Sequence, residues 1–314
     1  MDIVFFGSSD FSIPSLRALA SSGNRLLYLV TQPDRKKGRG LQLGATIAKQ
    51  AANDLGIKVY QEQDINAGRS LEFLKGLGAD LFVVVAFGQI LSKELLNIPK
   101  KLCVNAHASL LPKYRGAAPV NWAIIKGEAE SGVTLIKMSQ KMDAGPVIMQ
   151  EKVNISLDET SLCLEQRLAE LSAKLLLKCI DAIKQDDLTF TAQDQAEVSF
   201  ASKLKKQDGL IDWKSSAHKL HDLVRGSLPW PGAFTYYNGK LLKIYKSSVS
   251  LSSSAGNNAG AGMVLEVSVN GITVATSKGA LLIKEVQLAG KKRMAAQEFI
   301  SGSRIAAGDL LGKK

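Results

Sequence analysis

The chain has 314 residues, of which 46% are hydrophobic and 22% charged, a composition typical of a folded protein with about two domains. Its three cysteines show neither a CxxC spacing nor a histidine at zinc-ligand spacing, so we predict three buried thiols and no metal site. The start lacks the features of a signal peptide. The longest apolar run, residues 81–87, is far shorter than the roughly 18 residues of a membrane span. We therefore expect a cytoplasmic protein without a membrane segment.

The positive charge of the chain is concentrated in its last third. Residues 1–200 carry 23 basic and 22 acidic side chains, a balance of +1, whereas residues 201–314 carry 17 and 7, a balance of +10. Such asymmetry is typical of a module that binds a polyanion. A lysine-rich solvated surface would give the same count, so charge alone leaves both interpretations open.

The first half of the chain alternates short apolar segments with helical patterns. The predicted strands lie at residues 3–6, 26–31, 57–60, 81–87, 102–106, 133–138 and 147–154. The predicted helices lie at residues 14–20, 44–55, 70–77, 93–97, 118–126 and 159–183. Strands without polar alternation, separated by helices, indicate a parallel sheet covered on both faces. We predict a Rossmann-like, doubly wound α/β domain over residues 1–190.

The pattern changes after Asp186. Residues 191–206 are predicted to form a linker, and residues 211–225 a helix. The predicted strands that follow lie at residues 234–237, 241–246, 264–269, 272–276 and 281–286. Asn238-Gly239 and Asn270-Gly271 separate two pairs of these strands, which is the strongest short hairpin signal. Five short strands predict a small OB-like β-barrel over residues 207–314.

Polar side chains occur where ligands bind to an open α/β sheet, beyond the carboxyl ends of its strands. Asn105 and His107 come at the end of the strand 102–106 and, as alternate residues, project to the same side. Asp143 lies in a tight loop between two later strands. A lone histidine is often structural, and an aspartate before small residues often forms a turn. The turn after the first strand lacks the GxGxxG spacing, so no dinucleotide is predicted.

The motifs around these residues resemble those of the folate-dependent formyltransferase family. The similar segments are Asn105-Ala106-His107, Ser109-Leu110-Leu111-Pro112, Arg115-Gly116-Ala117-Ala118-Pro119 and Asp143-Ala144-Gly145. Other segments resemble the branch of the family that acts on methionyl-tRNA. They are Gln32-Pro33-Asp34-Arg35, Gly38-Arg39-Gly40, Leu210-Ile211-Asp212-Trp213, Pro229-Trp230-Pro231 and Ala289-Gly290-Lys291-Lys292. The similarity extends in order from Ile3 to about Phe299.

The resemblance implies transfer of a formyl group from 10-formyltetrahydrofolate to the α-amine of methionine esterified to initiator tRNA. Asn105 would then bind the formyl oxygen, and His107 would take the amine proton or stabilise the oxyanion. Asp143 would orient the imidazole. No metal is required, because the donor is already activated. The resemblance places tetrahydrofolate along Ser109, Leu110, Leu111 and Pro112 and near Phe87 and Gly88, although Leu110 and Leu111 fit a core position equally well.

The tRNA would meet basic residues in two places. Arg35, Lys36, Lys37 and Arg39 lie in a Gly-rich loop, residues 31–41, which we expect to clamp the acceptor end. Lys203, Lys205, Lys206, Lys291, Lys292 and Arg293 would extend this binding surface over the barrel domain. We assign Trp213 and Trp230 to core or interface packing rather than to base stacking, and we expect a monomer.

Two other functions fit part of the pattern. A relative that formylates a sugar-nucleotide amine or a glycinamide nucleotide would carry the same three polar residues, but it would not need the basic second domain. A non-catalytic RNA-binding protein would need the basic domain, but not an intact set of Asn105, His107 and Asp143.

Overall fold

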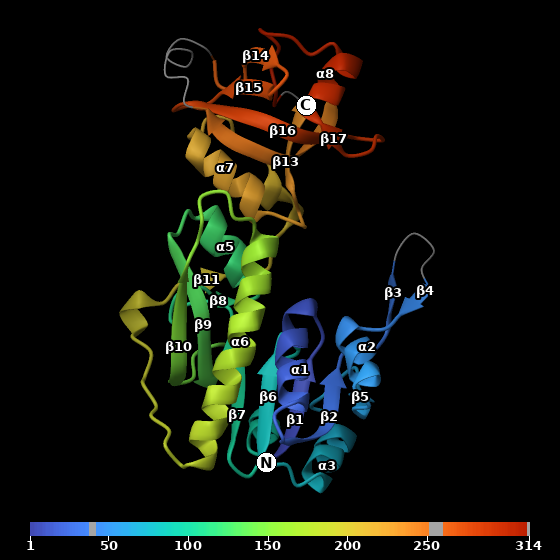
Figure 1. Cartoon of the computed structure of the whole chain (residues 1–314), viewed down its shortest axis with the longest axis vertical. Coiled ribbons are helices and arrows are strands. Elements are labelled where there is room, and N and C mark those ends of the chain that lie inside the picture. Colours follow the sequence, from blue (N-terminus) through green and yellow to red (C-terminus); the bar gives the residue numbers. More distant parts are fainter. Residues whose placement is uncertain (38–41, 251–259, 313–314) are drawn as a thin grey trace. The chain divides into compact units, whose positions relative to one another are not determined.

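The computed structural model describes residues 1–37, 42–250 and 260–312, with the backbone alone for residues 36–37 and 42–43. The chain folds into two compact units (Figure 1). Unit 1 comprises Met1–Pro119, Ser131–Val153 and Glu165–Ala201, and unit 2 comprises Val120–Glu130, Asn154–Leu164 and Ser202–Lys314. The predicted linker, residues 191–206, is therefore divided, since its residues up to Ala201 pack in unit 1.

A seven-stranded sheet forms the centre of unit 1, in the order β10-β9-β7-β6-β1-β2-β5. Its strands are β1 (Asp2–Gly7), β2 (Arg25–Thr31), β5 (Val59–Gln61), β6 (Leu81–Val85), β7 (Leu102–His107), β9 (Glu130–Lys137) and β10 (Val147–Asn154). The predicted strands are confirmed, but the sheet is mixed, because β9 runs antiparallel to β7. The register pairs His107 with Thr134 and Val104 with Lys137, so β9 starts from the end at which β7 finishes. Antiparallel edges on largely parallel sheets are common.

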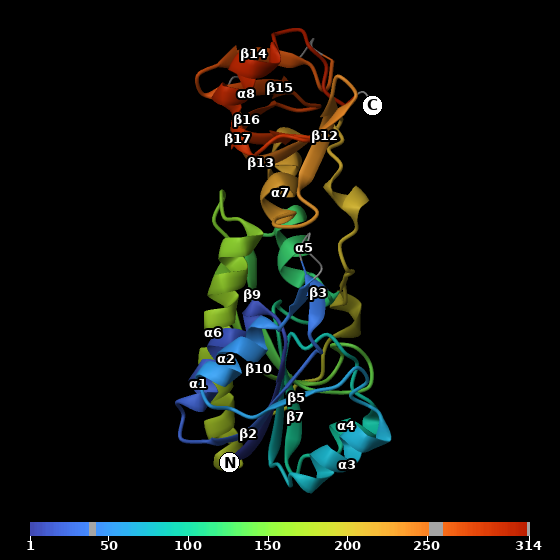
Figure 2. The ribbon, with the colours of Figure 1, turned by 90° about the vertical axis from the view of Figure 1, so that its right-hand side faces the viewer.

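Helices cover both faces of this sheet (Figure 2). One face carries α1 (Ile13–Ala20), α2 (Ile47–Asp54) and α6 (Ser161–Lys184), and the other carries α3 (Gly68–Gly76) and α4 (Lys93–Leu96). The Ser15 and Ser172 hydroxyls, 3.3 Å apart, join α1 to α6. Under α3 and α4, Phe6 and Phe82 belong to an apolar cluster that also contains Cys103. This arrangement confirms the predicted doubly wound architecture.

Two short pairs of strands lie outside the large sheet. The antiparallel pair β3 (Arg35–Lys37) and β4 (Gln42–Gly44) forms within and just after the predicted basic loop, residues 31–41. The parallel pair β8 (Arg115–Gly116) and β11 (Phe200–Ala201) joins the segment after His107 to residues 200–201 of the predicted linker.

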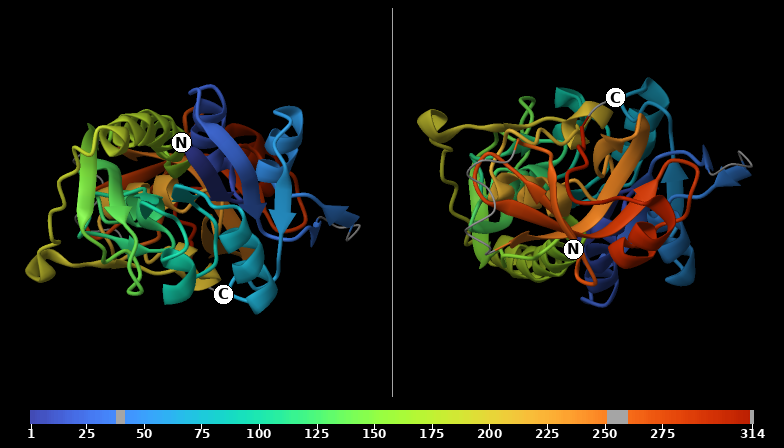
Figure 3. Two further views of the ribbon diagram at one scale, coloured as in Figure 1. Left: turned by 90° about the horizontal axis from the view of Figure 1, so that it is seen from below. Right: turned by 90° about the horizontal axis from the view of Figure 1, so that it is seen from above.

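Unit 2 is built around antiparallel strands in the order β12-β13-β16-β15-β14, with β17 paired to β16. The strands of this unit are coloured orange to red in Figure 3. The strands are β12 (Ala233–Tyr237), β13 (Lys240–Ser250), β14 (Val264–Ser268), β15 (Gly271–Ala275), β16 (Ala280–Leu288) and β17 (Met294–Ala295). Both predicted hairpins are confirmed. At the first, Asn238 and Gly239 have φ of 48° and 72°, the two positive values that a type I′ turn requires.

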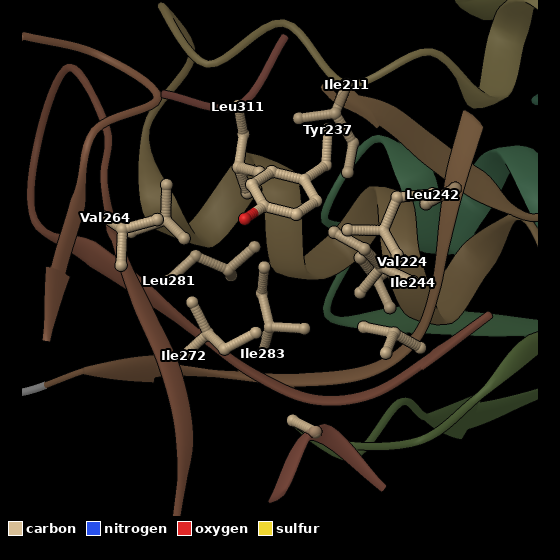
Figure 4. Packing of buried hydrophobic residues seen from close by; sticks show 14 of the residues in the cluster. Ile211, Val224, Tyr237, Leu242, Ile244, Val264, Ile272, Leu281, Ile283 and Leu311 are labelled. Atoms are coloured by element: carbon tan, nitrogen blue, oxygen red, sulfur yellow. The ribbon is translucent and has the colours of Figure 1, made fainter. Parts of the chain in front are cut away.

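The core of unit 2 fills the inside of the bent sheet (Figure 4). Leu242, Ile244 and Ile283 are completely buried there. The end of the described chain bridges the two edge strands, because Val264 donates to the Asp309 carbonyl at 2.8 Å and Gly312 to the Tyr236 carbonyl at 2.9 Å. These bonds connect β14 to β12 through the C-terminal segment, as expected for a barrel-like domain.

Among the described residues, three α-helices belong wholly or largely to unit 2, namely α5 (Pro119–Ile125), α7 (Ala217–Gly226) and α8 (Ala296–Ser303). The predicted helix 211–225 was wrong in its first six residues. Ile211 donates to the Phe234 carbonyl at 2.8 Å, and the Trp213 indole, 5% exposed, donates to Thr235 Oγ1 at 3.0 Å. Packing into the barrel core therefore replaces the first helical turns. The packing role predicted for Trp213 is confirmed.

Within the described residues, no helix combines the length and apolar character needed to cross a membrane. Cys103 and Cys179 are buried, whereas Cys163 is exposed, so the prediction of three buried thiols was wrong for Cys163. Cys163 lies on the first turn of α6, where its amide donates to Thr160 Oγ1 at 3.3 Å.

Candidate active site

Strand β7 places Asn105 and His107 on one face of the large sheet, together with Cys103 two residues earlier. Asn105 lies between β6 and β9, paired with Val84 and Ile136. It is half-buried, and within the described part of the chain its side-chain amide makes no hydrogen bond. This N–H donor is therefore available to a ligand oxygen.

The imidazole of His107 is held between two oxygen atoms. The ring is 6% exposed, its Nε2 lies 2.9 Å from the Tyr114 carbonyl oxygen, and its Nδ1 lies 3.6 Å from Asp143 Oδ2. Because a carbonyl only accepts hydrogen bonds, Nε2 carries a proton in this arrangement. The structure thus brings together the histidine and the aspartate that the sequence separates by more than thirty residues.

Asp143 lies in the loop between β9 and β10. Its φ is 51°, which is unusual for a residue other than glycine. Its Oδ2 accepts a hydrogen bond of 2.9 Å from the Gly116 amide. At Gly116, φ is 123° and a Cβ would lie 2.6 Å from the Ala201 carbonyl oxygen, so only glycine fits this close approach.

The Ser-Leu-Leu-Pro segment is fixed by two residues that the sequence did not single out. Thr134 Oγ1 donates to the Ser109 carbonyl at 2.6 Å and accepts from the Leu111 amide at 3.1 Å. Gln150 Nε2 donates to Thr134 Oγ1 at 2.8 Å and to the Leu111 carbonyl at 2.9 Å. Ser109 and Leu111 are therefore buried and committed to internal contacts, while Leu110 is half-buried.

Phe87 and Gly88, the other predicted folate contacts, follow β6. Phe87 is 2% exposed and packs edge-on against Phe6, with ring centroids 5.4 Å apart. Gly88 is exposed, with φ of 85°. Phe87 thus belongs to the core, and Gly88 is the member of this pair that solvent and ligands can reach.

A cavity of about 340 Å³ lies at the start of β7, between α4 and the end of β9. Leu96, Cys103 and Met138 form an apolar part of its lining, and Asn97 and Gln140 belong to a polar part. Because Cys103 alternates with Asn105 and His107, this cavity and the polar pair share one face of β7. Burial raises the pKa of the Cys103 thiol, so it is a poor nucleophile. The alternation of Cys103 with Asn105 and His107 along one strand is the sequence signal from which the position of the cavity could have been predicted.

A second cavity, of about 280 Å³, lies beyond the carboxyl ends of β1 and β2. Ser8, Gln32, Pro33 and Thr46 contribute to its lining, together with Arg35 from the basic hairpin. Arg35 is exposed and donates from Nη2 to Gln32 Oε1 at 2.9 Å. The backbone of Lys36 and Lys37 continues β3, and Arg39 lies outside the described residues.

The predicted basic residues of unit 2 are exposed side chains, namely Lys203, Lys205, Lys206, Lys291, Lys292 and Arg293. Arg293 differs from the lysines because its Nη2 lies 2.7 Å from Glu285 Oε2 and its guanidinium lies 4.3 Å from the Tyr245 ring centroid. The Arg293 hydrogen bond holds the pKa of Glu285 below its usual value, so this carboxylate offsets the arginine charge.

Trp230 does not occupy a core position, one of the two packing roles predicted for it. Its side chain is 52% exposed. A Cβ at Gly209 would lie 3.1 Å from Pro231 Cγ, so it is the neighbouring proline that packs closely here, while the indole remains at the surface.

Fold and site together define a class of enzyme. A doubly wound sheet presents an available amide donor, an imidazole beside a carboxylate, and a partly apolar cavity on one face. These groups suit transfer of an acyl-type group to an amine, in which charge develops on a carbonyl oxygen and a proton leaves nitrogen.

Comparisons with known proteins narrow this class. The sequence model described as formyl transferase matches residues 1–180, and that of the formyl transferase C-terminal domain matches residues 203–304. The chain belongs to the formyl transferase family. It is 44% identical over 314 residues to the methionyl-tRNA formyltransferase of Citrifermentans bemidjiense, covering 100% of this chain and 97% of that protein. The same-named protein of Geobacter metallireducens is 43% identical, with 99% of each chain covered.

A solved structure shares the fold. The sugar 3N-formyl transferase WlaRD superposes with a TM-score of 0.69 and 21% identity, covering 93% of this chain and 99% of that one. Its structure was determined in the presence of dTDP and 5-N-formyl-THF. The same architecture thus occurs in a sugar formyl transferase.

Proposed function

We propose that this protein transfers the formyl group of 10-formyltetrahydrofolate to the α-amino group of methionine esterified to initiator tRNA. The supporting observation is the extent of the similarity to methionyl-tRNA formyltransferases. At 43–44% identity it spans both units, including the basic C-terminal domain. The sugar 3N-formyl transferase shares the fold at only 21% identity. A tRNA substrate places the enzyme in the cytoplasm, and we expect it to act as a monomer.

The amine attacks the formyl carbon, the bond from that carbon to N10 of the folate breaks, and tetrahydrofolate leaves with the proton that His107 took from the amine. The side chains on β7 and its neighbouring loops provide the catalysis. The Asn105 amide donates a hydrogen bond to the formyl oxygen as negative charge develops there. With Nε2 of His107 bonded to Tyr114, Nδ1 is the ring atom able to accept a proton. The charged ring would then have an acceptor at each nitrogen, the Tyr114 carbonyl and the Asp143 carboxylate. Asp143 therefore both orients His107 and stabilises its charge.

We assign the flat ring system of the folate to the cavity between α4 and β7. Leu96, Cys103 and Met138 offer an apolar surface, and Asn97 and Gln140 offer hydrogen-bonding groups, the mixture expected for an aromatic heterocycle. Ser109 and Leu111 would act indirectly, because their backbone groups are bonded to Thr134 and keep the neighbouring loop in place. Leu110, Pro112 and Gly88 do not line this cavity and stay as proposed folate contacts outside it.

The acceptor end of the tRNA would bind beside the basic hairpin, which is formed by β3 and β4. Arg35 borders the second cavity, which is large enough for a small apolar side chain and has hydroxyl groups at Ser8 and Thr46. Phosphate contacts by the exposed lysines of unit 2 would hold the body of the tRNA. The aminoacyl group and the phosphates would thus be bound by different parts of the chain.

A formylation assay tests the proposal. Purified protein is given the formyl-folate donor with methionyl-tRNA, free methionine, a glycinamide nucleotide or a sugar-nucleotide amine. We expect efficient product formation with methionyl-tRNA alone. Preferential formylation of a sugar or glycinamide amine would assign the chain to another branch of the family. Binding of tRNA without consumption of the donor would support a non-catalytic RNA-binding role.

A further inference from the structure

A glutamine from the predicted linker lies between strand β8 and the loop that carries Asp143. Gln193 is 8% exposed and precedes β11 by seven residues. Its Oε1 accepts hydrogen bonds from Arg115 Nε at 3.0 Å and from Nη2 at 2.7 Å. Its Nε2 donates to the Asp143 carbonyl at 2.8 Å and to the Gly145 carbonyl at 2.7 Å. One side chain therefore joins the Arg115–Gly116 strand to the Asp143 loop.

The partners leave no ambiguity in how this amide is oriented. Arg115 only donates and the two carbonyls only accept, so the oxygen of Gln193 must face the guanidinium and its nitrogen must face the loop. All four hydrogen-bonding positions of the amide are used. Arg115 is itself 6% exposed, and within the described residues its side chain donates only to Gln193. Loss of Gln193 would leave a buried guanidinium and two loop carbonyls without partners.

The Asp143 loop depends on outside support because its backbone conformation is unfavourable. Asp143 has φ of 51°, and such a conformation persists only where surrounding contacts hold it. Gln193 bonds the carbonyl of Asp143 itself, while Gly116 bonds its carboxylate. Backbone and side chain of the aspartate are thus fixed from two directions. Gln193 does not reach His107, so any effect on the imidazole passes through Asp143.

We propose that Gln193 is a positioning residue of the active site, which sets the Asp143 carboxylate against His107 by holding the Asp143–Gly145 loop to Arg115. This inference rests on the proposed function only because its first test is a formylation assay. The proposal also assigns a role in the active site to the part of the predicted linker that ends at Ala201, since that part belongs to unit 1.

The first test compares three variants of the full chain in the formylation assay. Gln193→Met keeps the length of the side chain and removes all four bonds. Gln193→Glu keeps the acceptor for Arg115 and removes both donors. Gln195→Ala is the matched control, since this exposed glutamine lies two residues away and its loss removes only a 2.9 Å bond to the Gln193 backbone carbonyl, which leaves the four bonds of the Gln193 side chain in place. We expect both Gln193 variants to lower kcat by about tenfold or more with KM for either substrate nearly unchanged, because small misplacements of catalytic groups are costly. The control should retain the parent's kcat.

A double-variant comparison separates positioning from a general structural role. In the Asp143→Ala background, Gln193→Met should reduce kcat by less than about twofold, since the group it positions is already gone. Losses that multiply would overturn the proposal, as would parental kcat in either folded Gln193 variant. Failure of both Gln193 variants to fold would make the residue part of the general core and would also overturn it.

A spectroscopic readout makes the inference independent of the enzyme assay. The ring resonances of His107, assigned by their loss in His107→Asn, are sensitive to the placement of the Asp143 carboxylate beside the ring. We expect Gln193→Met to shift them and Gln195→Ala to leave them in place. If the parent protein formylates nothing, the proposed function fails while this measurement still decides the role of Gln193. Unshifted His107 resonances in Gln193→Met would contradict that role.

Discussion

The loops around His107 and the basic surface of unit 2 use polar residues in opposite ways. Around His107, the groups are buried or half-buried, and His107 and Asp143 have defined partners, as with the 2.9 Å bond from Gly116 to Asp143. On unit 2, Lys291 and Lys292 are exposed. The first arrangement suits chemistry, which needs fixed distances. The second suits binding to phosphates, which depends on charge more than on precise placement. Substitutions should therefore act on turnover in one region and on salt-dependent affinity in the other.

The largest effect should come from the three polar groups themselves. Alanine at Asn105, His107 or Asp143 should lower kcat by about a hundredfold or more, because each group is needed mainly in the transition state. Affinity for tRNA should change little. Steady-state kinetics with each substrate varied, together with a tRNA-binding titration, measure both quantities. Near-parental turnover in all three variants would remove these residues from the mechanism.

The buried loop should also be intolerant of a single added methyl group. A Cβ at Gly145 would lie 1.8 Å from the Lys137 carbonyl oxygen, so Gly145→Ala must displace the Asp143 loop. We expect a loss of about 1–3 kcal/mol in the free energy of unfolding and a marked fall in kcat. Gly76→Ala is the control, because this glycine lies within α3 and its Cβ would meet nothing within 4 Å. Denaturant unfolding of both variants makes the comparison, and equal stability would refute it.

Substitutions on the exposed basic surface should weaken tRNA binding by different amounts. Lys291→Ala with Lys292→Ala should weaken tRNA binding severalfold and reduce the slope of log affinity against log salt by about one for each phosphate that the variant no longer neutralises. Turnover at saturating tRNA should stay at the parental level. Arg293→Ala should change the slope less, since Glu285 already offsets its charge. Binding titrations at two or more salt concentrations test this order, and a larger effect from Arg293 would reverse our ranking.

The smallest effect concerns the thiols. Cys163 is exposed, whereas burial raises the pKa of the Cys103 thiol, and that of Cys179 to about 12. A thiol reagent at neutral pH should therefore modify Cys163 alone in the folded protein, as mass spectrometry would show. Modification should leave formylation unchanged. Rapid labelling of Cys103 would instead show that the donor cavity opens to solvent.

Local sequence was sufficient for the elements and for several of their ends. Strands with continuous apolar character and the two Asn-Gly turns depend on backbone preference and burial, which neighbouring residues report directly. The motif around Asn105 and His107 was readable for the same reason, since both side chains belong to one strand. Helix 211–225 shows the limit of this reasoning. Its first residues have acceptable helical spacing, but Trp213 gains more by filling the barrel core.

Tertiary structure alone decided which distant residues meet. No local pattern shows that β9 returns antiparallel to β7, or that the carboxylate of Asp143 comes within 3.6 Å of His107. Sequence likewise left Gln193 in a linker, although it bonds Arg115 across 78 positions of the chain. Such contacts arise because buried polar groups must find partners wherever the packed chain brings them, and sequence distance does not enter that requirement. The sequence by itself therefore determined the strands, the turns and the chemical types at the site, while the packed fold determined their partners.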